Sequence, residues 1–426
     1  MPRLDVVRDL APVASLTTQQ IVLDVIPAVR ARTVPESVAY ARANPGRLNV
    51  GNSGHGTVSH PAAELFGQAT GSEFASVPHR GAHPGRVRRH PGLDGAHPVG
   101  QPAPAVAMPA AFSASATARR ALARRVGEAL DAIGFLVITG HGVEPRLITE
   151  VQRVSNAFFD LPLEEKLRVR RPAPGVARGY IPLEAESVGR SQGVDVPGDL
   201  NESLMVGPVD VPPGDAYFSG PAAGKHFHPN LWPERPAELR APYEACFRAM
   251  GDLAAGLMAM FALALDLPED FFADKINRHI SRLRVRNYPA PLVPSKPGQL
   301  RAGARADYGS LTILRAEDKP GGLQVLNRAG DWVDVPIAPD GHVINIGELM
   351  ARWTDERWRA TLHRVVNPPA EQASASRRLS LVFFHNPNYD APMEALPGTV
   401  APGAAPKFSP TTSGEHLRAQ FLRTQV

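Results

Sequence analysis

Cysteine is almost absent from this sequence, since Cys246 is the only one in 426 residues. No internal disulfide can form, which fits a reducing compartment and predicts a cytoplasmic protein. Long apolar runs are also missing, because the longest extends over 13 residues, from Leu253 to Leu265. A bilayer-spanning helix needs about 20 apolar residues, so this run predicts a buried helix and no membrane partner. The N-terminal residues MPRLDVVRDLAPV lack the apolar region of a secretory signal.

There is also no strong excess of charge of one sign. Lysine and arginine together number 46 against 42 aspartate and glutamate residues, which gives a net charge of +4. The arginines are scattered along the chain and are not grouped into a basic stripe with interleaved aromatic residues. We therefore expect them to form a solvated surface, and we expect no nucleic-acid partner.

Proline, in contrast, is abundant, with 43 residues, or about twice its usual share of ~5%. Much of the chain is therefore expected to form loops, turns or linkers. Apolar residues make up 43% of the sequence, which is enough for a large core. At roughly 150 residues per domain, the length predicts two or three structural units.

The first 78 residues predict a small α/β fragment. Residues 38–43 are expected to form a helix, 48–50 a short strand followed by the loop GNSGHGT, and 60–68 a second helix. The stretch ARANPGRLNVGNSGHGTVSHPAAELFGQATG resembles the tripartite-tricarboxylate receptor family of periplasmic solute-binding proteins. In that family the glycine-rich loop binds a carboxylate through backbone N–H groups at a helix start. The match covers only part of one lobe, which favours a fusion remnant or a gene-model artefact over a working solute-binding module.

Residues 79–105 are rich in proline, glycine, histidine and arginine and show no periodicity. Such a segment cannot bury enough apolar area to offset the entropy lost on ordering it, so we predict a disordered linker. Its histidines could bind metal weakly, although a solvated linker is the simpler interpretation; they are His79, His83, His90 and His97.

Regular secondary structure is expected from residue 106 onward. Apolar residues between Leu122 and Ile133 recur on one helical face, and residues 135–138 then predict a buried strand that ends at Gly140. Further helices are expected over about 145–159 and 239–266.

After residue 280 the pattern changes to short alternating strands separated by glycine-containing turns. The predicted strands cover residues 283–286, 310–314, 323–326, 332–335, 343–346 and 379–384. Helices followed by six or more short strands predict a mainly β fold with flanking helices, whose core is an antiparallel barrel or jelly roll.

Polar residues in the strand region carry the clearest functional pattern. Asp307 lies in RAGARADYGSLTIL, and His363 lies in TLHRVVNP, 56 residues later. Arg378 and Ser380 lie in RRLSLVFFHNP. Side chains alternate along a strand, so residues 305 and 307 are expected to point the same way, as are 378 and 380.

Residues 106–400 resemble the isopenicillin-N-synthase-like 2-oxoglutarate/Fe(II) dioxygenases. The matching blocks, in order, are IGFLVITGHGV, FFDLPLEEK, DLNESLMVGP, PNLWP, RNYPAP, GGLQVLNRAGDWVDVP, VINIGELMARWT, LHRVVNP and RRLSLVFFHNPNYDAP. The resemblance implies a double-stranded β-helix, or jelly-roll, core. It divides the chain into a solute-binding-protein-like fragment (1–78), a disordered linker (79–105), a helical dioxygenase region (106–235), the β-helix domain (236–400) and a C-terminal tail (401–426).

By this resemblance, Fe(II) would bind a His-x-Asp pair on one strand and a distant histidine on another. Asp307 and His363 match two of these three ligands, and the full set leaves three positions open for 2-oxoglutarate and O2. Arg378 would pair with the distal carboxylate of 2-oxoglutarate, because a guanidinium matches a carboxylate with two hydrogen bonds. Ser380 and Tyr288, the tyrosine of RNYPAP, would hydrogen-bond the same carboxylate. The alternatives are a surface ion pair for Arg378 and a structural core position for His363.

The chain departs from the family pattern at the first ligand, where Arg305 stands in place of histidine. Arginine has no lone pair to donate and stays protonated, so it cannot coordinate iron. It could instead form an ion pair with Asp307, and we expect the iron affinity to fall by at least about 10- to 100-fold. His342 and His385 lie in strand regions and are candidates for a substitute ligand, although neither stands at a family ligand position.

The reaction that the resemblance implies is oxidation of a small-molecule C–H bond by Fe(II), 2-oxoglutarate and O2, with release of succinate and CO2. Its outcome could be hydroxylation, desaturation or ring closure, or the fragmentation of 2-oxoglutarate to ethylene as in some bacterial relatives. A second hypothesis is a pseudoenzyme that binds 2-oxoglutarate without turnover, and a third is solute binding by the N-terminal fragment. The substrate is expected to contact loops around 178–187 and 201–205 and the segment after Asn386.

Overall fold

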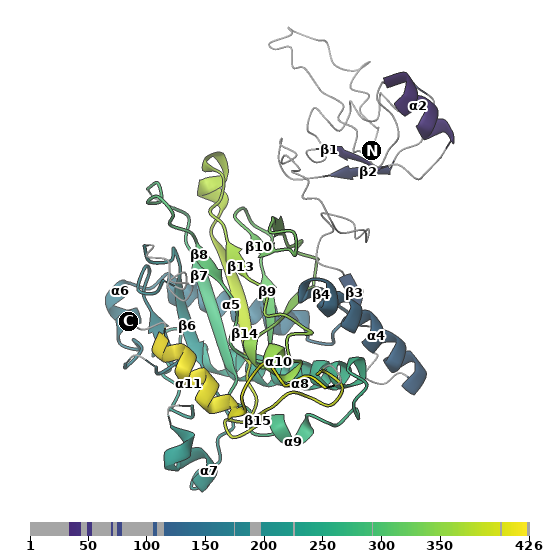
Figure 1. Cartoon of the computed structure of the whole chain (residues 1–426). Coiled ribbons are helices and arrows are strands. Elements are labelled where there is room, and N and C mark those ends of the chain that lie inside the picture. Colours follow the sequence, from purple (N-terminus) through teal and green to yellow (C-terminus); the bar gives the residue numbers. More distant parts are fainter. Residues whose placement is uncertain are drawn as a thin grey trace. The chain divides into compact units, whose positions relative to one another are not determined.

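The computed structural model describes two compact units, Met1–Ala96 and His97–Val426 (Figure 1). The described residues are 34–43, 49–52, 70, 75–78, 105–108 and 115–423, the last range without 174, 188–196, 225, 292 and 401–402. The helix predicted over 60–68 lies outside these residues. So does the predicted linker, with its four histidines, up to residue 104.

The described part of the first unit is a helix and a pair of strands. Helix α2 (Val34–Ala43) precedes strand β1 (Asn49–Asn52), as the sequence predicts. Strand β1 pairs in parallel with β2 (Ala75–Pro78). Parallel strands need a long connection between them and are typical of α/β folds. The fragment therefore has the α/β character expected for residues 1–78.

The second unit is built on two sheets that form the predicted jelly roll (Figure 1). The larger sheet has the strand order β3-β4-β12-β9-β14-β7-β6-β5, and the smaller has the order β11-β10-β13-β8. Neighbouring strands are antiparallel except for β3 and β4. The strands are β3 (Ala105–Ala107), β4 (Phe135–Thr139), β5 (Gly179–Ile181), β6 (Glu202–Val206), β7 (Arg282–Tyr288), β8 (Ala302–Arg305), β9 (Leu311–Ala316), β10 (Leu323–Leu326), β11 (Trp332–Asp334), β12 (His342–Ile346), β13 (His363–Val365) and β14 (Arg378–His385), with a separate pair β15 (Pro392–Met393) and β16 (Thr411–Thr412).

Helices flank the larger sheet, and those expected over 122–133, 145–159 and 239–266 are confirmed. Helix α4 begins after Ser115, whose hydroxyl accepts a hydrogen bond from the Ala118 N–H, and it ends at Gly134 with φ at 71°. The helices of this unit are α4 (Ala116–Ile133), α5 (Pro145–Phe159), α6 (Leu163–Leu167), α7 (Ala216–Ser219), α8 (Arg240–Ala264), α9 (Ala273–Ile276), α10 (Glu348–Trp353) and α11 (Ser413–Arg423), with 3-10 helices η3 (Pro221–Ala223) and η4 (Ala370–Ala375).

Each face of the larger sheet has its own core. One face packs with α4, α5 and α8 in an apolar cluster that includes Val285, Leu381 and Phe261. The other face forms a second cluster with the smaller sheet, to which Phe135, Val325 and Val365 belong. Tyr288 is part of this second cluster, so the predicted 2-oxoglutarate residues lie between the two sheets.

Helix α8 is long and apolar enough, by length and composition alone, to cross a membrane. In the structure 56% of its apolar window is buried. It packs against α4 and α5 and against strands β7, β9 and β14. This burial is typical of a core helix, which is what the apolar run 253–265 predicts.

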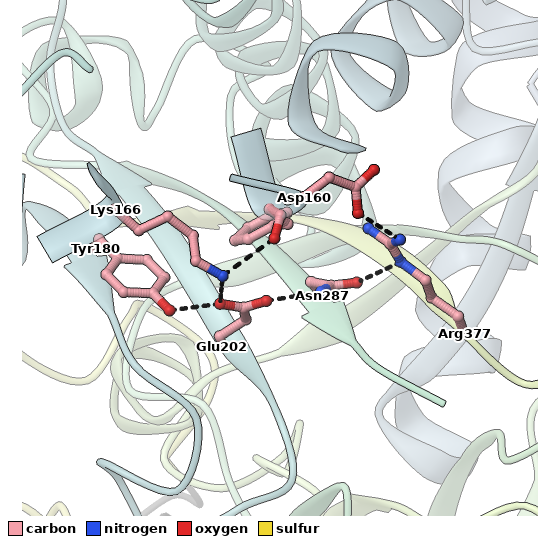
Figure 2. A network of polar contacts seen from close by, with 7 residues as sticks. Asp160, Lys166, Tyr180, Glu202, Asn287 and Arg377 are labelled. Atoms are coloured by element: carbon pink, nitrogen blue, oxygen red, sulfur yellow. Dashed lines mark hydrogen bonds and ion pairs between the residues drawn. The ribbon is translucent and has the colours of Figure 1, made fainter. Parts of the chain in front are cut away.

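A network of polar side chains lies on the helix side of the larger sheet (Figure 2). The Glu202 carboxylate accepts hydrogen bonds from Lys166 Nζ (2.8 Å), from the Asn287 amide (2.8 Å) and from the Tyr180 hydroxyl. Lys166 Nζ also donates to the carbonyl of Phe159 at the end of α5 (3.0 Å). Glu202 and Asn287 are paired across β6 and β7. The network therefore ties these strands to α5 and α6 and fixes their register.

Three elements beside the predicted site differ from the sequence-based expectation. Strands β8 and β13 are not among the predicted strands, and they form one edge of the smaller sheet. The predicted C-terminal tail, 401–426, contains helix α11, so it is not simply a tail. These elements lie within loop-like sequence, so the hydrophobic pattern does not indicate them.

Candidate functional site

The two predicted metal ligands are brought together at the edge of the smaller sheet. His363 Nε2 lies 3.6 Å from Asp307 Oδ1, and both side chains are only 5% exposed. His363 opens β13, directly opposite Arg305 at the end of β8. Asp307 lies two residues beyond that strand, in an irregular segment, so strand alternation does not explain its direction. Arg305 and Asp307 nevertheless line the same cavity.

Neighbouring polar groups orient both predicted ligands. Asp307 Oδ2 accepts hydrogen bonds from the Thr312 hydroxyl and from the Asn345 amide, each at 2.7 Å. His363 Nδ1 lies 3.1 Å from the Thr361 carbonyl. A carbonyl can only accept, so Nδ1 carries the proton of this hydrogen bond and Nε2 faces Asp307. Such supporting hydrogen bonds are what hold the ligands of metal sites in place.

Arg305, which the family resemblance puts at the first ligand position, pairs through its Cα with His363 across β8 and β13. Its Nη1 donates to the Gly303 carbonyl (3.1 Å), and it does not form the ion pair with Asp307 that the sequence suggested. Burial, together with nearby Arg286, lowers the pKa of the Arg305 guanidinium below its ordinary value. Burial alone would raise the pKa of Asp307, but His363 and Arg305 hold it well below its usual range.

A complete iron site does not fit these residues. Among the described residues no group of three or more His, Cys, Asp or Glu side chains is placed to hold a metal ion. The two candidates for a substitute ligand are engaged elsewhere. His385 Nδ1 lies 2.7 Å from the Ser310 hydroxyl, and His342 Nδ1 lies 2.7 Å from His141 Nε2.

The predicted 2-oxoglutarate residues lie together on the inner face of the larger sheet. Tyr288 pairs with Arg378 across β7 and β14, and Arg286 pairs with Ser380. Opposed residues of an antiparallel pair project from the same face. The Arg378 guanidinium lies 5.3 Å from the centre of the Tyr288 ring, and Arg378 Nη1 donates to the Gly321 carbonyl (2.7 Å).

Several buried polar atoms here have no hydrogen-bond partner of good geometry among the described residues. They are Arg378 Nε, Ser380 Oγ and Arg286 Nε. Burial would raise the pKa of Tyr288, but the guanidinium groups of Arg286, Arg378 and Arg305 and the nearby Ser380 hydroxyl hold it below its ordinary value. Buried polar groups are nearly always satisfied, and an unsatisfied set points to a missing partner. A carboxylate would supply acceptors for all three atoms.

A cavity of about 390 Å³ lies beside Asp307. Of the loops expected to contact substrate, Ile181, residues 185–187, Met205 and Asn386 line it. Arg178 instead donates to the backbone carbonyls of residues 177, 226 and 228. The cavity is also lined by residues that were not predicted from the sequence: Arg282, Arg284 and Arg286 of β7 and Leu417 and Phe421 of α11. The alternation of RLRVR was the available signal for the three arginines.

Comparisons with known proteins identify the family. The family described as the 2OG-Fe(II) oxygenase superfamily matches residues 279–387, and the non-haem dioxygenase N-terminal family (in morphine synthesis) matches residues 104–235. The 2-oxoglutarate-Fe(II) type oxidoreductase hxnY of Emericella nidulans is 30% identical over 318 residues, or 74% of this chain and 87% of that protein. The chain belongs to the 2-oxoglutarate/Fe(II)-dependent dioxygenase family.

Further proteins and a second family are also similar to parts of this chain. Validamycin A dioxygenase of Streptomyces hygroscopicus subsp. limoneus is 30% identical over 67% of this chain and 77% of its own length. The crystal structure of a full-length Neurospora crassa protein in complex with alpha-KG superimposes with a TM-score of 0.67 at 29% identity, covering 77% of this chain and 98% of that one. Residues 3–88 match the tripartite tricarboxylate transporter family receptor, as the N-terminal sequence predicts.

Proposed function

We propose that the jelly roll of this chain binds 2-oxoglutarate through Arg378, Ser380 and Tyr288, and that Arg305 leaves it with little Fe(II)-dependent oxygenase turnover. The observation that supports binding is the set of unsatisfied buried atoms, which includes Arg378 Nε and Ser380 Oγ. A guanidinium and a carboxylate form two parallel, charge-assisted hydrogen bonds. The hydroxyl groups of Ser380 and Tyr288 would complete the contacts of that carboxylate.

The observation that argues against efficient turnover is the placement of Arg305. Its backbone lies directly opposite His363, and its guanidinium has no lone pair to offer a metal. It also adds a positive charge beside the two ligands that remain. Loss of a mere supporting hydrogen bond typically lowers metal affinity about 10- to 100-fold, so the loss of a ligand to a cation is expected to cost more.

An active oxygenase of this family is the second candidate function. It is favoured by the intact support of the remaining ligands, since Asp307 keeps its hydrogen bonds to Thr312 and Asn345 and His363 keeps its bond to Thr361. With iron bound, such a site would couple 2-oxoglutarate breakdown to succinate and CO2 with hydroxylation, desaturation or ring closure of a small molecule. The two candidates differ in iron binding, which is measurable.

Restoring the missing ligand tests the proposal. Arg305→His should raise the bound Fe(II) at least ten-fold, toward one ion per chain, because it completes two histidines and one carboxylate. Succinate formation from 2-oxoglutarate should rise with it. Arg305→Gln is the matched control, since it removes the charge without adding a ligand, and it should gain much less iron. Iron is measured by anaerobic equilibrium dialysis and succinate by mass spectrometry.

Two results would overturn the proposal. Tight 1:1 iron binding by the unmodified chain, with succinate production at the level of Arg305→His, would establish the active oxygenase. Failure of the unmodified chain to bind 2-oxoglutarate in a calorimetric titration would remove the binding function itself.

A further inference from the structure

The cavity beside Asp307 is lined by more positive than negative side chains. Its five guanidinium groups face only two carboxylates. The cations are Arg171, Arg282, Arg284, Arg286 and Arg305, and the anions are Glu186 and Asp307. A desolvated excess of cations is costly unless an anion offsets it. The arginines of the cavity that form no ion pair therefore indicate where a ligand anion binds.

Both carboxylates of the wall are already engaged. Glu186 forms ion pairs of 2.6 Å with Arg171 and with Arg284. Burial would raise the pKa of Glu186, but Arg284 and Arg171 lower it to about 2. Asp307 faces His363, whose Nε2 lies 3.6 Å from its Oδ1, and it also interacts with Arg305. Neither acid forms an ion pair with Arg282.

Among the cavity arginines that form no ion pair, Arg282 lies farthest from the predicted 2-oxoglutarate residues. It is 8% exposed, and no carboxylate of the described residues lies within ion-pair distance of it. Its guanidinium lies over the Phe421 ring, 4.4 Å from the ring centre. Burial lowers the pKa of Arg282 to about 10. A buried arginine that contacts an aromatic ring and no acid is suited to binding an anionic group beside an apolar surface.

Part of the cavity lining is apolar. Helix α11 contributes Leu417 and Phe421, one turn apart, and Val176, Ile181 and Met205 line the cavity as well. A volume of about 390 Å³ is at the small end of the range of ligand pockets, roughly 300–1,000 Å³. The cavity thus suits a small molecule with an apolar body and an acidic end.

We propose that the organic ligand of this cavity is a small monocarboxylic acid with an apolar or aromatic body, whose carboxylate binds Arg282 beside Phe421. The proposal deepens the proposed function and rests on it, because the same cavity extends to Arg305 and Asp307. Arg282 pairs with Phe384 across the larger sheet, Phe384 pairs with Thr312, and the Thr312 hydroxyl donates to Asp307 Oδ2. An acid held at Arg282 therefore has its body beside Asp307, and its single charge matches the Arg282 guanidinium, which forms no ion pair with the described residues.

The test compares an acid with its neutral isostere on the full chain saturated with 2-oxoglutarate. The probes are 3-phenylpropionate and 3-phenylpropionamide, titrated by ligand-observed NMR. The acid should bind at least ten-fold more tightly than the amide. In Arg282→Gln this preference should fall to within two-fold. Arg240→Gln removes an exposed arginine, paired with Glu244 at the start of α8, and should keep the preference.

Several outcomes would overturn the proposal. If the unmodified chain binds the acid and the amide equally, the proposal is wrong. It is also wrong if folded Arg282→Gln keeps the full preference for the acid. Tighter binding of phenyl phosphate than of 3-phenylpropionate would show that the site recognises a phosphate ester and not a carboxylate. Should Arg282→Gln not fold, Arg282→Lys keeps the charge without the planar fork and should retain only part of the preference.

A separate titration with 2-oxoglutarate alone distinguishes this proposal from the proposed function. Arg282→Gln should bind 2-oxoglutarate with the affinity of the unmodified chain, because Arg378 holds it. If the unmodified chain binds 2-oxoglutarate normally but does not prefer the acid to the amide, only the monocarboxylate proposal is refuted. Absent 2-oxoglutarate binding refutes the proposed function, whatever the acid preference.

Discussion

Tyr288 shows how strongly single residues shape the electrostatics of this site. Arg286, Arg305 and Arg378 all lie near it, and together they hold the pKa of this buried phenol below its ordinary value although burial would raise it. Arg305 contributes to the cationic surroundings of both Tyr288 and Asp307. The guanidinium of Arg305 therefore makes these surroundings more favourable to an anion.

Arg378 is the residue on which 2-oxoglutarate binding should depend most. Arg378→Gln removes a charge-assisted pair, worth about 1.5–3 kcal/mol, so the dissociation constant should rise roughly ten- to a hundred-fold. The dissociation constant of Arg378→Lys should lie between those of the unmodified chain and Arg378→Gln, since lysine keeps the charge but cannot form two parallel hydrogen bonds. Isothermal titration calorimetry measures both.

The neighbouring residue provides the control for this prediction. The Arg377 guanidinium is directed to the opposite side, where it donates to Asp160 (2.6 Å) and Asn287 (3.3 Å). Arg377→Gln should therefore leave the 2-oxoglutarate affinity within two-fold. Equal losses in the Arg377 and Arg378 variants would mean that general charge, and not the proposed contact, attracts the ligand.

At the scale of elements, the sequence predicts long or regular segments well and the short ones beside the site poorly. The alternating runs that form β7 and β14 are predicted, and with them the register partners Tyr288 and Arg378. Strands β8 and β13 contain only four and three residues, too few for alternation to be recognised. Asp307 reaches the site from the irregular segment after β8, and the position of such a residue depends on tertiary packing.

The arginines of β7 show a second limit of sequence periodicity. The alternation of RLRVR shows that the three arginines share one face, but every residue of β7 is buried, so it does not show that this face lines a cavity. A strand exposed on one face would have revealed this by its polar residues. The binding role of Arg282 depends on Phe421 of α11, more than a hundred residues away, a contact that only the fold defines.

The polar network of β6 and β7 (Figure 2) predicts a large loss of stability from a single change. Lys166 and Glu202 form an ion pair in which each side chain is only 10% exposed. Glu202→Ala leaves the ammonium buried without its carboxylate, and breaking such a pair costs about 3–5 kcal/mol. The free energy of unfolding from urea denaturation should fall by this amount.

An exposed ion pair is the matched control for this change. Glu244→Ala, which disrupts the Arg240–Glu244 pair on the surface of α8, should cost at most about 1 kcal/mol. The double variant Lys166→Met/Glu202→Leu should recover much of the loss, because no unpaired charge remains. If Glu202→Ala costs no more than Glu244→Ala, the network does not stabilise the sheet.

At the scale of the whole molecule, burial of basic groups links stability to pH. Four largely buried histidines of the jelly-roll unit have their pKa lowered by burial. They are His226, His279, His342 and His385. For His226 and His279 burial lowers the pKa to about 4. The fold thus keeps these histidines neutral where the unfolded chain would protonate them.

The sign of the resulting pH dependence follows from these directions. Above about pH 6.5 the histidines are neutral in the folded and the unfolded chain, so their contribution to stability is complete. As the pH falls from 6.5 toward 4, the unfolded chain takes up protons that the folded chain refuses, and stability is lost. Each such histidine contributes a slope of up to about 1.4 kcal/mol per pH unit. Between pH 6.5 and 5 the unfolded carboxyl groups are still largely ionised, so this window isolates the histidines.

His279 is the histidine with which to test this pH dependence. Its ring stacks on Phe247 and lies near His385 and Phe383, and the charge that favours its protonation comes from Asp252. His279→Gln should therefore reduce the slope of unfolding free energy against pH between 6.5 and 5 by up to one proton. Above pH 7.5 the curves of the two proteins should run parallel, whatever their offset. Identical slopes below pH 6.5, measured by urea denaturation in matched buffers, would show that His279 titrates alike in the folded and unfolded chain and that the acid sensitivity arises elsewhere.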